Sequence, residues 1–302
     1  MNWFWFAIIA LLCWSGSDFF SKIGCVDGRD KYSHLKMVIA VGAVMGLHAA
    51  YEVFIGGTEI SWQVIFTYLP VSLLYILSMA MGYVGLRYIE LSISSPICNS
   101  SGALVAVATI ITSGISGMNG WQIAAIVLVC GGVIGLGVAE MTEDEELRCA
   151  RQEKGKWQYA KNWKALLLPA AYCVLDAAGT FADSLVLETL NEDSANVAYE
   201  LTFLAAGVFC LIFLLVKRQR FTLKAELPKY TGAIFETAGQ FAYIYALADT
   251  EHVAMSAPII SAYCAASVLW SRLFLKERLS WKHYLAIFVA VVGIVIMGVF
   301  DA

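Results

Sequence analysis

Two carboxylates inside apolar segments are the residues of this chain best placed to do chemistry. Asp176 lies near the middle of the segment 164–188, and Glu236 lies within the segment 228–248. An ionisable side chain inside a membrane costs free energy, so it usually faces a cavity or a partner. No Lys or Arg lies at comparable depth. We therefore expect both acids to bind a cation or a proton; the alternative is a protonated acid that hydrogen-bonds a neighbouring helix.

Aromatic and polar residues recur beside each acid at three- to four-residue spacing, which places them on one helical face. One face carries Tyr172, Asp176, Thr180 and Asp183, and the other carries Glu236, Gln240 and Tyr243. A cation over a desolvated aromatic ring gains up to about 2 kcal/mol, and a carboxylate adds Coulomb attraction. An organic amine or a quaternary ammonium would suit such a pocket, although aromatic stripes also serve as packing.

Residues of other segments complete the predicted substrate site. The full set is Trp14, Tyr75, Asn99, Tyr172, Asp176, Glu200, Glu236, Gln240, Tyr243 and Tyr263. The candidates for proton coupling are Asp18, Asp176 and Glu236.

Several of these polar residues have a structural alternative. Asp18 could pair with Lys22 one turn away. Glu200 and Asp183 lie nearer the outer face, where solvation would account for them. Asn99 follows Pro96 by one turn, so it serves either a substrate or backbone groups freed by the proline.

Enzyme motifs are absent from the sequence: there is no phosphate-binding loop before a helix, no Gly-x-Ser-x-Gly and no His-Glu-x-x-His. The cysteines show no paired metal spacing, and His48 suits a packed or hydrogen-bonded imidazole better than a relay. We expect no enzyme activity, no cofactor and no metal. The scattered charge gives no reason to expect nucleic acid as a partner.

The composition requires a membrane protein. Of 302 residues, 60% are hydrophobic and only 15% are charged, which leaves too little polar surface for a soluble globule. Segments long enough to span a bilayer lie at 3–24, 33–54, 62–83, 90–113, 121–140, 164–188, 194–216, 228–248, 251–275 and 281–301. Lipid requires closed backbone hydrogen bonding, so an all-α polytopic bundle of ten transmembrane helices is predicted. The first segment shows no features of a cleaved signal peptide and is expected to stay as a helix.

Charge predicts the orientation. All 20 Lys and Arg residues lie in or beside alternate connections, whereas the opposite connections carry acids without Lys or Arg. The positive-inside rule therefore places the basic connections in the cytoplasm and both termini outside it, in a plasma (inner) membrane. The polar stretch 141–163 is predicted to be a cytoplasmic linker between two halves.

The two halves resemble one another. Ser94-Ser95-Pro96-Ile97 and Ser256-Ala257-Pro258-Ile259 are offset by 162 residues, and Trp121 and Trp281 each precede a glycine-containing apolar segment. Because each half has an odd number of segments, the second must enter the membrane inverted. We predict a first repeat at 1–140, the linker at 141–163 and a second repeat at 164–302.

These motifs resemble the EamA-type members of the drug/metabolite transporter superfamily. The resemblance rests on the two five-helix repeats, Trp14-Ser15-Gly16, the two proline motifs and Leu275-Lys276-Glu277-Arg278-Leu279-Ser280-Trp281. The segment 164–188 departs from it, since Tyr172 and Leu175 stand where Trp14 would recur. The resemblance implies a central cavity lined by the first four helices of each repeat, with the fifth peripheral, in a chain that acts as a monomer.

The sequence thus predicts a secondary active transporter of a small organic metabolite. A cationic or zwitterionic amine is favoured, choline-like or amino-acid-like, moved by alternating access with protons as a candidate coupling ion. One alternative is a broad-specificity exporter of amino acids or drugs. An alternative of another class is a membrane receptor or scaffold that does not transport.

Overall fold

The computed structural model describes residues 2–25, 30–85, 91–114, 118–142, 167–274 and 279–300. Within these ranges every regular element is a helix. The prediction of an all-α fold is therefore confirmed, while most of the predicted linker 141–163 lies outside the described residues.

The helices follow the predicted segments closely. The first half holds α1 (Trp3–Cys25), α2 (Ser33–Tyr51) with a π-helical turn at Glu52–Gly56, α3 (Trp62–Gly85), α4 (Leu91–Asn99), α5 (Ser101–Ser113) and α6 (Gly120–Met141). The second half holds α8 (Leu167–Leu187), α9 (Glu192–Val216), α10 (Leu223–Leu247), a 3-10 turn at Thr250–His252, α11 (Val253–Ser261), α12 (Tyr263–Phe274) and α13 (Trp281–Phe300).

Nine spans in the described ranges are long and apolar enough to cross a membrane. The tenth predicted segment is α10, which is also long but carries Glu226, Lys229, Glu236 and Gln240. This helix packs against α1, α2 and α9, and Lys229 and Gln240 are each only 2% exposed. The polar residues of α10 therefore lower its hydropathy while remaining covered by other helices.

Each of the two predicted segments 90–113 and 251–275 consists of two helices separated by a short break. The interruptions lie at Ser100 and Ala262, one turn after Pro96 and Pro258. The ψ angles of −7° and 0° depart from the helical value near −42°. Each amide N–H is shared between the carbonyls three and four residues back, as is common at helix ends. The same break occurs in both halves at the same offset of 162 residues.

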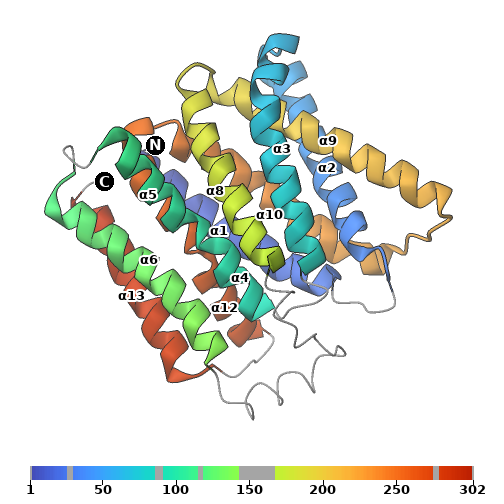
Figure 1. Ribbon diagram of the computed structural model, residues 1–302. Coiled ribbons are helices and arrows are strands. Elements are labelled where there is room, and N and C mark those ends of the chain that lie inside the picture. Colours follow the sequence, from blue (N-terminus) through green and yellow to red (C-terminus); the bar gives the residue numbers. More distant parts are fainter. Residues whose placement is uncertain are drawn as a thin grey trace.

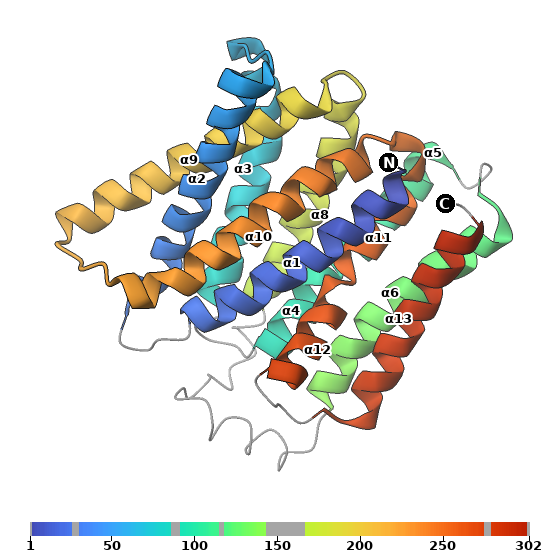
Figure 2. The same ribbon diagram turned by 180° about the vertical axis from the view of Figure 1, so that it is seen from behind.

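The packing relates the two halves. Helix α2 lies against α9, α5 against α11, and α6 against α13, and the contact of α1 with α10 has its counterpart in that of α8 with α3 (Figures 1 and 2). These are the pairs expected if a two-fold relation exchanges the five segments of one half with those of the other. The exact bounds of the repeats stay a prediction.

Glycines permit the closest of these contacts. A Cβ added at Gly42 of α2 would lie 2.5 Å from the Phe203 carbonyl oxygen of α9, and one at Gly293 of α13 would lie 2.8 Å from the Ala125 carbonyl oxygen of α6. Side chains at either position would push the paired helices apart.

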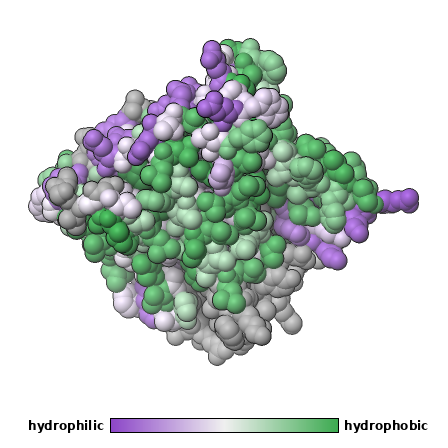
Figure 3. Space-filling model, turned by 45° about the horizontal axis from the view of Figure 1, so that its top comes forward, coloured by the Kyte–Doolittle hydropathy of each residue, from purple (hydrophilic) through white to green (hydrophobic). Residues whose placement is uncertain are grey.

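The exposed surface over the middle of the molecule is apolar (Figure 3). Ile111, Phe209 and Phe288 are among the large apolar side chains that are more than half exposed. Hydrophilic residues gather toward the edges of this view. Such an apolar belt fits contact with lipid, as expected of an integral membrane protein.

Candidate functional site

A central cavity of about 120 Å³ lies between the helices of the two halves. Since one water needs about 10–15 Å³ by this measure, there is room for several waters or part of a small solute. Its walls come from α1, α3, α4, α5, α8, α9, α10, α11 and α12. Neither α6 nor α13 contributes a described lining residue, in agreement with the peripheral place expected of the fifth helices. The second segment, α2, also contributes none among the described residues, because it packs outside α9 and α10.

The structure brings nine of the ten predicted substrate residues to this cavity, together with Asp18. They are Trp14, Tyr75, Asn99, Tyr172, Asp176, Glu236, Gln240, Tyr243 and Tyr263. These residues come from both halves of the chain, so the cavity depends on how the halves pack together.

Each of the three cavity carboxylates has a serine hydroxyl beside it. Ser101 Oγ donates to Asp176 Oδ2 over 2.7 Å, and Ser95 Oγ donates to Asp18 Oδ2 over 3.2 Å.

Ser17 hydrogen-bonds Glu236, and the charges of Asp18 and Asp176 act on this carboxylate. The described lining residues include no Lys, Arg or His, while Lys22, one turn along α1, acts electrostatically on Asp18. The cavity is therefore strongly acidic where Asp176 and Glu236 lie.

Aromatic rings stand around the acids. The Trp14 ring centroid lies 4.9 Å from that of Tyr243 and 5.9 Å from that of Tyr263. Gly239 of α10 makes room for the indole, which an added Cβ would overlap. The Trp14 indole nitrogen is buried without a hydrogen-bond partner. The Trp14 side chain thus offers a ring face and an indole N–H donor at the cavity.

A group of hydroxyls closes one side of the cavity. Tyr243 Oη donates to Thr180 Oγ1 over 2.8 Å and contacts Tyr75 Oη. Behind them, Asp183 accepts hydrogen bonds from Tyr68 Oη at 2.8 Å and Tyr75 Oη at 3.3 Å. Asp183 is 0% exposed. The expectation that solvation accounts for Asp183 is therefore wrong, because α3 covers it.

Glu200 is the one predicted substrate residue that the structure does not place at the cavity. Its carboxylate lies 2.8 Å from Nδ1 of His48 on α2 and is 0% exposed, so it is not solvated either. The preceding residue, Tyr199, lines the cavity instead. Successive helical side chains point about 100° apart, and the sequence alone did not reveal which of the two faces inward.

Asn99 uses its amide within its own helix, where Nδ2 donates to the Ser95 carbonyl oxygen over 2.8 Å. Its side chain also hydrogen-bonds Tyr263 across the cavity. The Ser95 carbonyl is not the one freed by Pro96, which lies four residues before the proline, and a role of Asn99 in substrate binding stays a prediction.

Comparison with known proteins identifies the family. Residues 163–299 match the family model described as the EamA-like transporter family. The matched residues make up the second of the two halves, which belongs to the EamA-type transporters of the drug/metabolite transporter superfamily. A solved structure described as "Crystal structure of protein" matches this transporter with a TM-score of 0.66 at 12% identity, over 98% of this chain and 96% of that chain. This likeness shows a shared fold over both halves. No curated protein matches the sequence.

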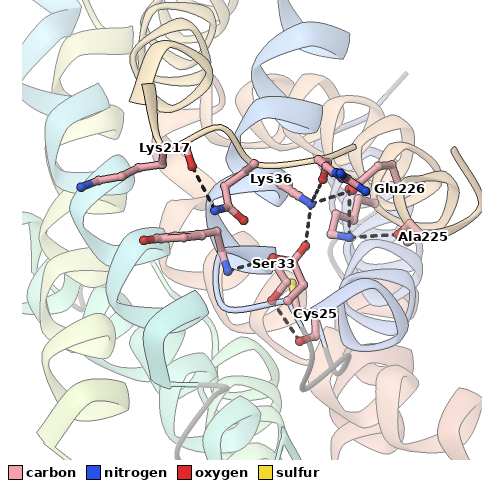
Figure 4. A network of polar contacts seen from close by, with 11 residues as sticks. Cys25, Ser33, Lys36, Lys217, Ala225 and Glu226 are labelled. Atoms are coloured by element: carbon pink, nitrogen blue, oxygen red, sulfur yellow. Dashed lines mark hydrogen bonds and ion pairs between the residues drawn. The ribbon is translucent and has the colours of Figure 1, made fainter. Parts of the chain in front are cut away.

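One polar cluster of this EamA transporter was not foreseen from the sequence. Lys36 Nζ lies 2.7 Å from Asp30 Oδ2 and 3.2 Å from Glu226 Oε1, and Lys229 Nζ lies 3.0 Å from Glu226 Oε2. Figure 4 shows Lys36 and Glu226 pointing toward one another where α2 meets α10. We call Asp30, Lys36, Glu226 and Lys229 the ionic cluster.

Both lysines of the ionic cluster are buried, with 6% and 2% of the side chain exposed. The charge pattern placed both lysines in or beside the basic connections and did not indicate that they are buried. The signal available in the sequence was the position of Lys36 inside the apolar segment 33–54 and the three-residue spacing of Glu226 and Lys229.

Proposed function

We propose that this EamA transporter moves a small organic metabolite that carries an amine or ammonium group, by alternating access between its two halves. The favoured substrate class is a cationic or zwitterionic amine, such as a quaternary ammonium, a choline-like compound or an amino acid. The observation that carries the proposal is the gathering of Asp18, Asp176 and Glu236 around one cavity whose described lining residues include no basic side chain.

Electrostatics supports a cationic ligand. Several carboxylates that share a buried site repel one another unless a cation or a proton reduces their charge. A substrate ammonium would bind between Asp176 and Glu236, because the charge of Asp176 acts on the Glu236 carboxylate. Attraction between opposite charges is stronger in a protein interior than in bulk water.

The aromatic residues add shape and cation–π contact. Trp14 packs against Tyr243 and Tyr263, and Tyr172 lines the same cavity. In the proposal these four rings form the cage, while Gln240 and Asn99 supply neutral hydrogen-bonding groups. A methylated ammonium fits such a cage because its surface is apolar and its charge is diffuse.

The packing of the halves supports the proposal of alternating access. The cavity takes Asp18 from the first half and Asp176 and Glu236 from the second. The breaks at Ser100 and Ala262 lie beside cavity residues in both halves, so bending there would change the cavity. Protons are the proposed coupling ion, with Asp18, Asp176 and Glu236 as candidates to carry them.

We further propose a plasma (inner) membrane location with the basic connections in the cytoplasm, both termini outside it, and a monomer as the working unit. The support is the segregation of Lys and Arg to alternate connections and the presence of both halves of the cavity within one chain.

Uptake into liposomes tests the proposed function. Purified protein would be reconstituted and given labelled choline, a primary amine, amino acids and a sugar in separate assays. Saturable uptake of the cationic compounds is expected, with little uptake of the sugar. Uptake of neutral or anionic solutes alone would contradict the proposed substrate class.

The two alternatives give different results in the same experiment. A broad-specificity exporter would show competition by many unrelated amphiphilic compounds rather than by amines alone. A receptor or scaffold would bind a ligand in detergent yet show no flux above protein-free liposomes.

A further inference from the structure

Asp183 is a buried acid outside the cavity lining, and its surroundings set it apart from Asp176 and Glu236. It lies on α8 and is 0% exposed. Its oxygens accept hydrogen bonds from Tyr68 and Tyr75, both on α3. We propose that Asp183 is a proton-binding site that exchanges its proton with the substrate cavity through the hydroxyls of Tyr75 and Tyr243. This inference rests on the proposed function, and it assigns proton coupling to a residue beside the cavity.

The first step of the argument is the lack of a compensating charge. The hydrogen bonds that Asp183 accepts in the described structure come from phenol hydroxyls, which carry no charge. Burial of an ionised carboxylate without a cation is so costly that the group takes up a proton instead. Glu200 is equally buried but lies 2.8 Å from His48, which can carry a charge. Asp183 differs from Glu200 because it is fully buried and its described hydrogen-bond partners include no basic side chain.

The second step is the set of groups that face Asp183. From α3 these are Tyr68 and Tyr75, from α10 Tyr243, and from α8 itself Asp176, two turns away. Tyr199 of α9 packs edge-on against Tyr75, with 5.7 Å between ring centroids. These neighbours are hydroxyls and one further acid, so they favour the protonated form of Asp183.

The third step is a continuous path of hydroxyls. Tyr75 Oη lies 3.3 Å from both Asp183 Oδ2 and Thr180 Oγ1 and contacts Tyr243 Oη. Tyr243 Oη lies 2.8 Å from Thr180 Oγ1. Tyr75, Thr180 and Tyr243 line the cavity, whereas Asp183 and Tyr68 are outside the described lining. The hydroxyls therefore stand between the cavity and Asp183.

Proton transfer along this path is balanced. Protonated Asp183 gives its proton to Tyr75 Oη while Tyr75 passes its own hydroxyl proton to Tyr243. Tyr243 releases its proton to cavity water, which delivers it to an ionised Asp176 or Glu236. Each hydroxyl is left intact with its hydrogen bond reversed, Asp183 becomes a carboxylate, and one cavity carboxylate becomes an acid.

The hydroxyl path contains residues of both halves. Movement of one half relative to the other during transport would therefore alter the path. Tyr68 and Tyr75 belong to the first half, and Asp183, Thr180 and Tyr243 belong to the second. Any movement of α3 relative to α8 would break the hydrogen bonds to Asp183. A proton could then be exchanged with the cavity in one conformation and held back in the other.

Infrared spectroscopy tests protonation of Asp183 without any substrate. Spectra of wild type and Asp183→Asn at neutral pH should differ by one protonated-carboxyl C=O band, which disappears from the wild-type spectrum as the pH is raised. Glu200→Gln is the matched control and should leave that band in place. Absence of the band from the wild type, or its persistence in Asp183→Asn, would overturn the proposal. Tyr68→Phe, which removes a donor to the carboxylate, should retain the band to higher pH if Asp183→Asn fails to fold.

A transport assay then tests coupling, with labelled choline as the probe. Asp183→Asn should retain choline counterflow, which needs no gradient, and lose accumulation driven by a pH gradient. Unchanged accumulation in Asp183→Asn would overturn the coupling role. If wild type shows no choline counterflow while the infrared band is present, the proposed cationic substrate fails and the proton site stands.

Discussion

Two groups of buried charge in this EamA transporter are built in opposite ways. The ionic cluster contains two lysines and two acids that compensate one another within 3.2 Å. The cavity contains Asp18, Asp176 and Glu236, and its described lining residues supply hydroxyls but no basic side chain. Because buried charge must be compensated, the first group is complete within the fold, whereas in our proposal a ligand or protons complete the second.

The comparison separates structure from function. A compensated cluster where α2 meets α10 holds helices of the two halves together, and additional backbone acceptors satisfy its lysines: Lys36 Nζ donates to the Arg220 carbonyl oxygen and Lys229 Nζ to that of Ala225. An uncompensated acidic cavity lowers the stability of the empty protein. Replacing a buried acid is therefore expected to lower the stability of the protein in the ionic cluster, and to leave it unchanged or raise it in the cavity.

The largest effect is expected from breaking the ionic cluster. Lys229→Met leaves Glu226 buried with less positive charge beside it, and loss of one partner of a buried ion pair costs about 3–5 kcal/mol. Thermal unfolding of purified protein should show a much lower midpoint. The matched control is Lys224→Met, five residues earlier on the same helix and exposed, which should change stability by about 0.5 kcal/mol or less. Equal midpoints for the two variants would refute the structural role.

A second substitution sharpens that result. Adding Glu226→Gln to Lys229→Met leaves Lys36 paired with Asp30, so part of the lost stability should return. Further destabilisation in the double variant would mean that the charges of the cluster are not coupled.

The next largest effect is expected from neutralising the cavity. Asp176→Asn should leave the ligand-free protein as stable as wild type or more stable, because it removes an uncompensated acid. The same change should weaken binding of the best cation by about tenfold or more, equivalent to about 1.4 kcal/mol. Calorimetric titration measures the binding and thermal unfolding measures the stability. A large fall in ligand-free stability would show that Asp176 is structural.

A smaller loss is expected from the aromatic cage. Trp14→Leu removes the ring face beside Tyr243 and should weaken cation binding by roughly 2- to 30-fold, the equivalent of about 0.5–2 kcal/mol. Trp14→Phe keeps a ring and should lose less. Equal losses in both variants, compared by competition with a labelled cation, would assign the indole a role in shape or hydrogen bonding instead.

The smallest effect is the acid response of the ionic cluster at Asp30, which lies outside the membrane segments. Partial burial alone would raise the pKa of Asp30, but the hydrogen bonds from Lys36 and the Tyr32 amide and the charges of Lys36 and Lys229 outweigh it, so its pKa lies below the ordinary value. A carboxyl with a lowered folded-state pKa contributes stability above its unfolded pKa of about 3.9 and loses it as the pH falls through the folded value.

Asp30→Asn should therefore make the free energy of unfolding depend less steeply on pH below about pH 4. Near neutral pH the substitution should lower the free energy of unfolding by an amount that does not change with pH. Unfolding midpoints measured over a pH series provide the check. Identical slopes in wild type and Asp30→Asn would show that Asp30 does not contribute to the acid response.

Much of the fold could be predicted from the sequence because bilayer thickness sets helix length. The predicted segment 62–83 corresponds to α3 (Trp62–Gly85), and the predicted segment 281–301 corresponds to α13 (Trp281–Phe300). Spacing within one helix also placed Tyr172, Asp176 and Thr180 on one face, and all three line the cavity.

Contacts between helices were harder to foresee. Spacing along one helix does not determine which neighbour covers a face, so the burial of Asp183 by α3 and the distance of Glu200 from the cavity were missed. The ionic cluster joins residues of α2 and α10 that lie far apart in the chain, and only packing brings them together. The proline motifs marked the place of the helix breaks, but the breaks at Ser100 and Ala262 depend on backbone angles that no residue type there requires.

Matched charged and neutral ligands would test the acidic cavity most directly. Thermal stabilisation of purified protein would be measured with choline and with dimethylbutanol, in which carbon replaces the quaternary nitrogen, on wild type and Asp176→Asn. Stabilisation of wild type by choline alone, lost in Asp176→Asn, is the predicted result. Equal stabilisation by both compounds, unchanged in Asp176→Asn, would contradict the claim that the cavity recognises positive charge.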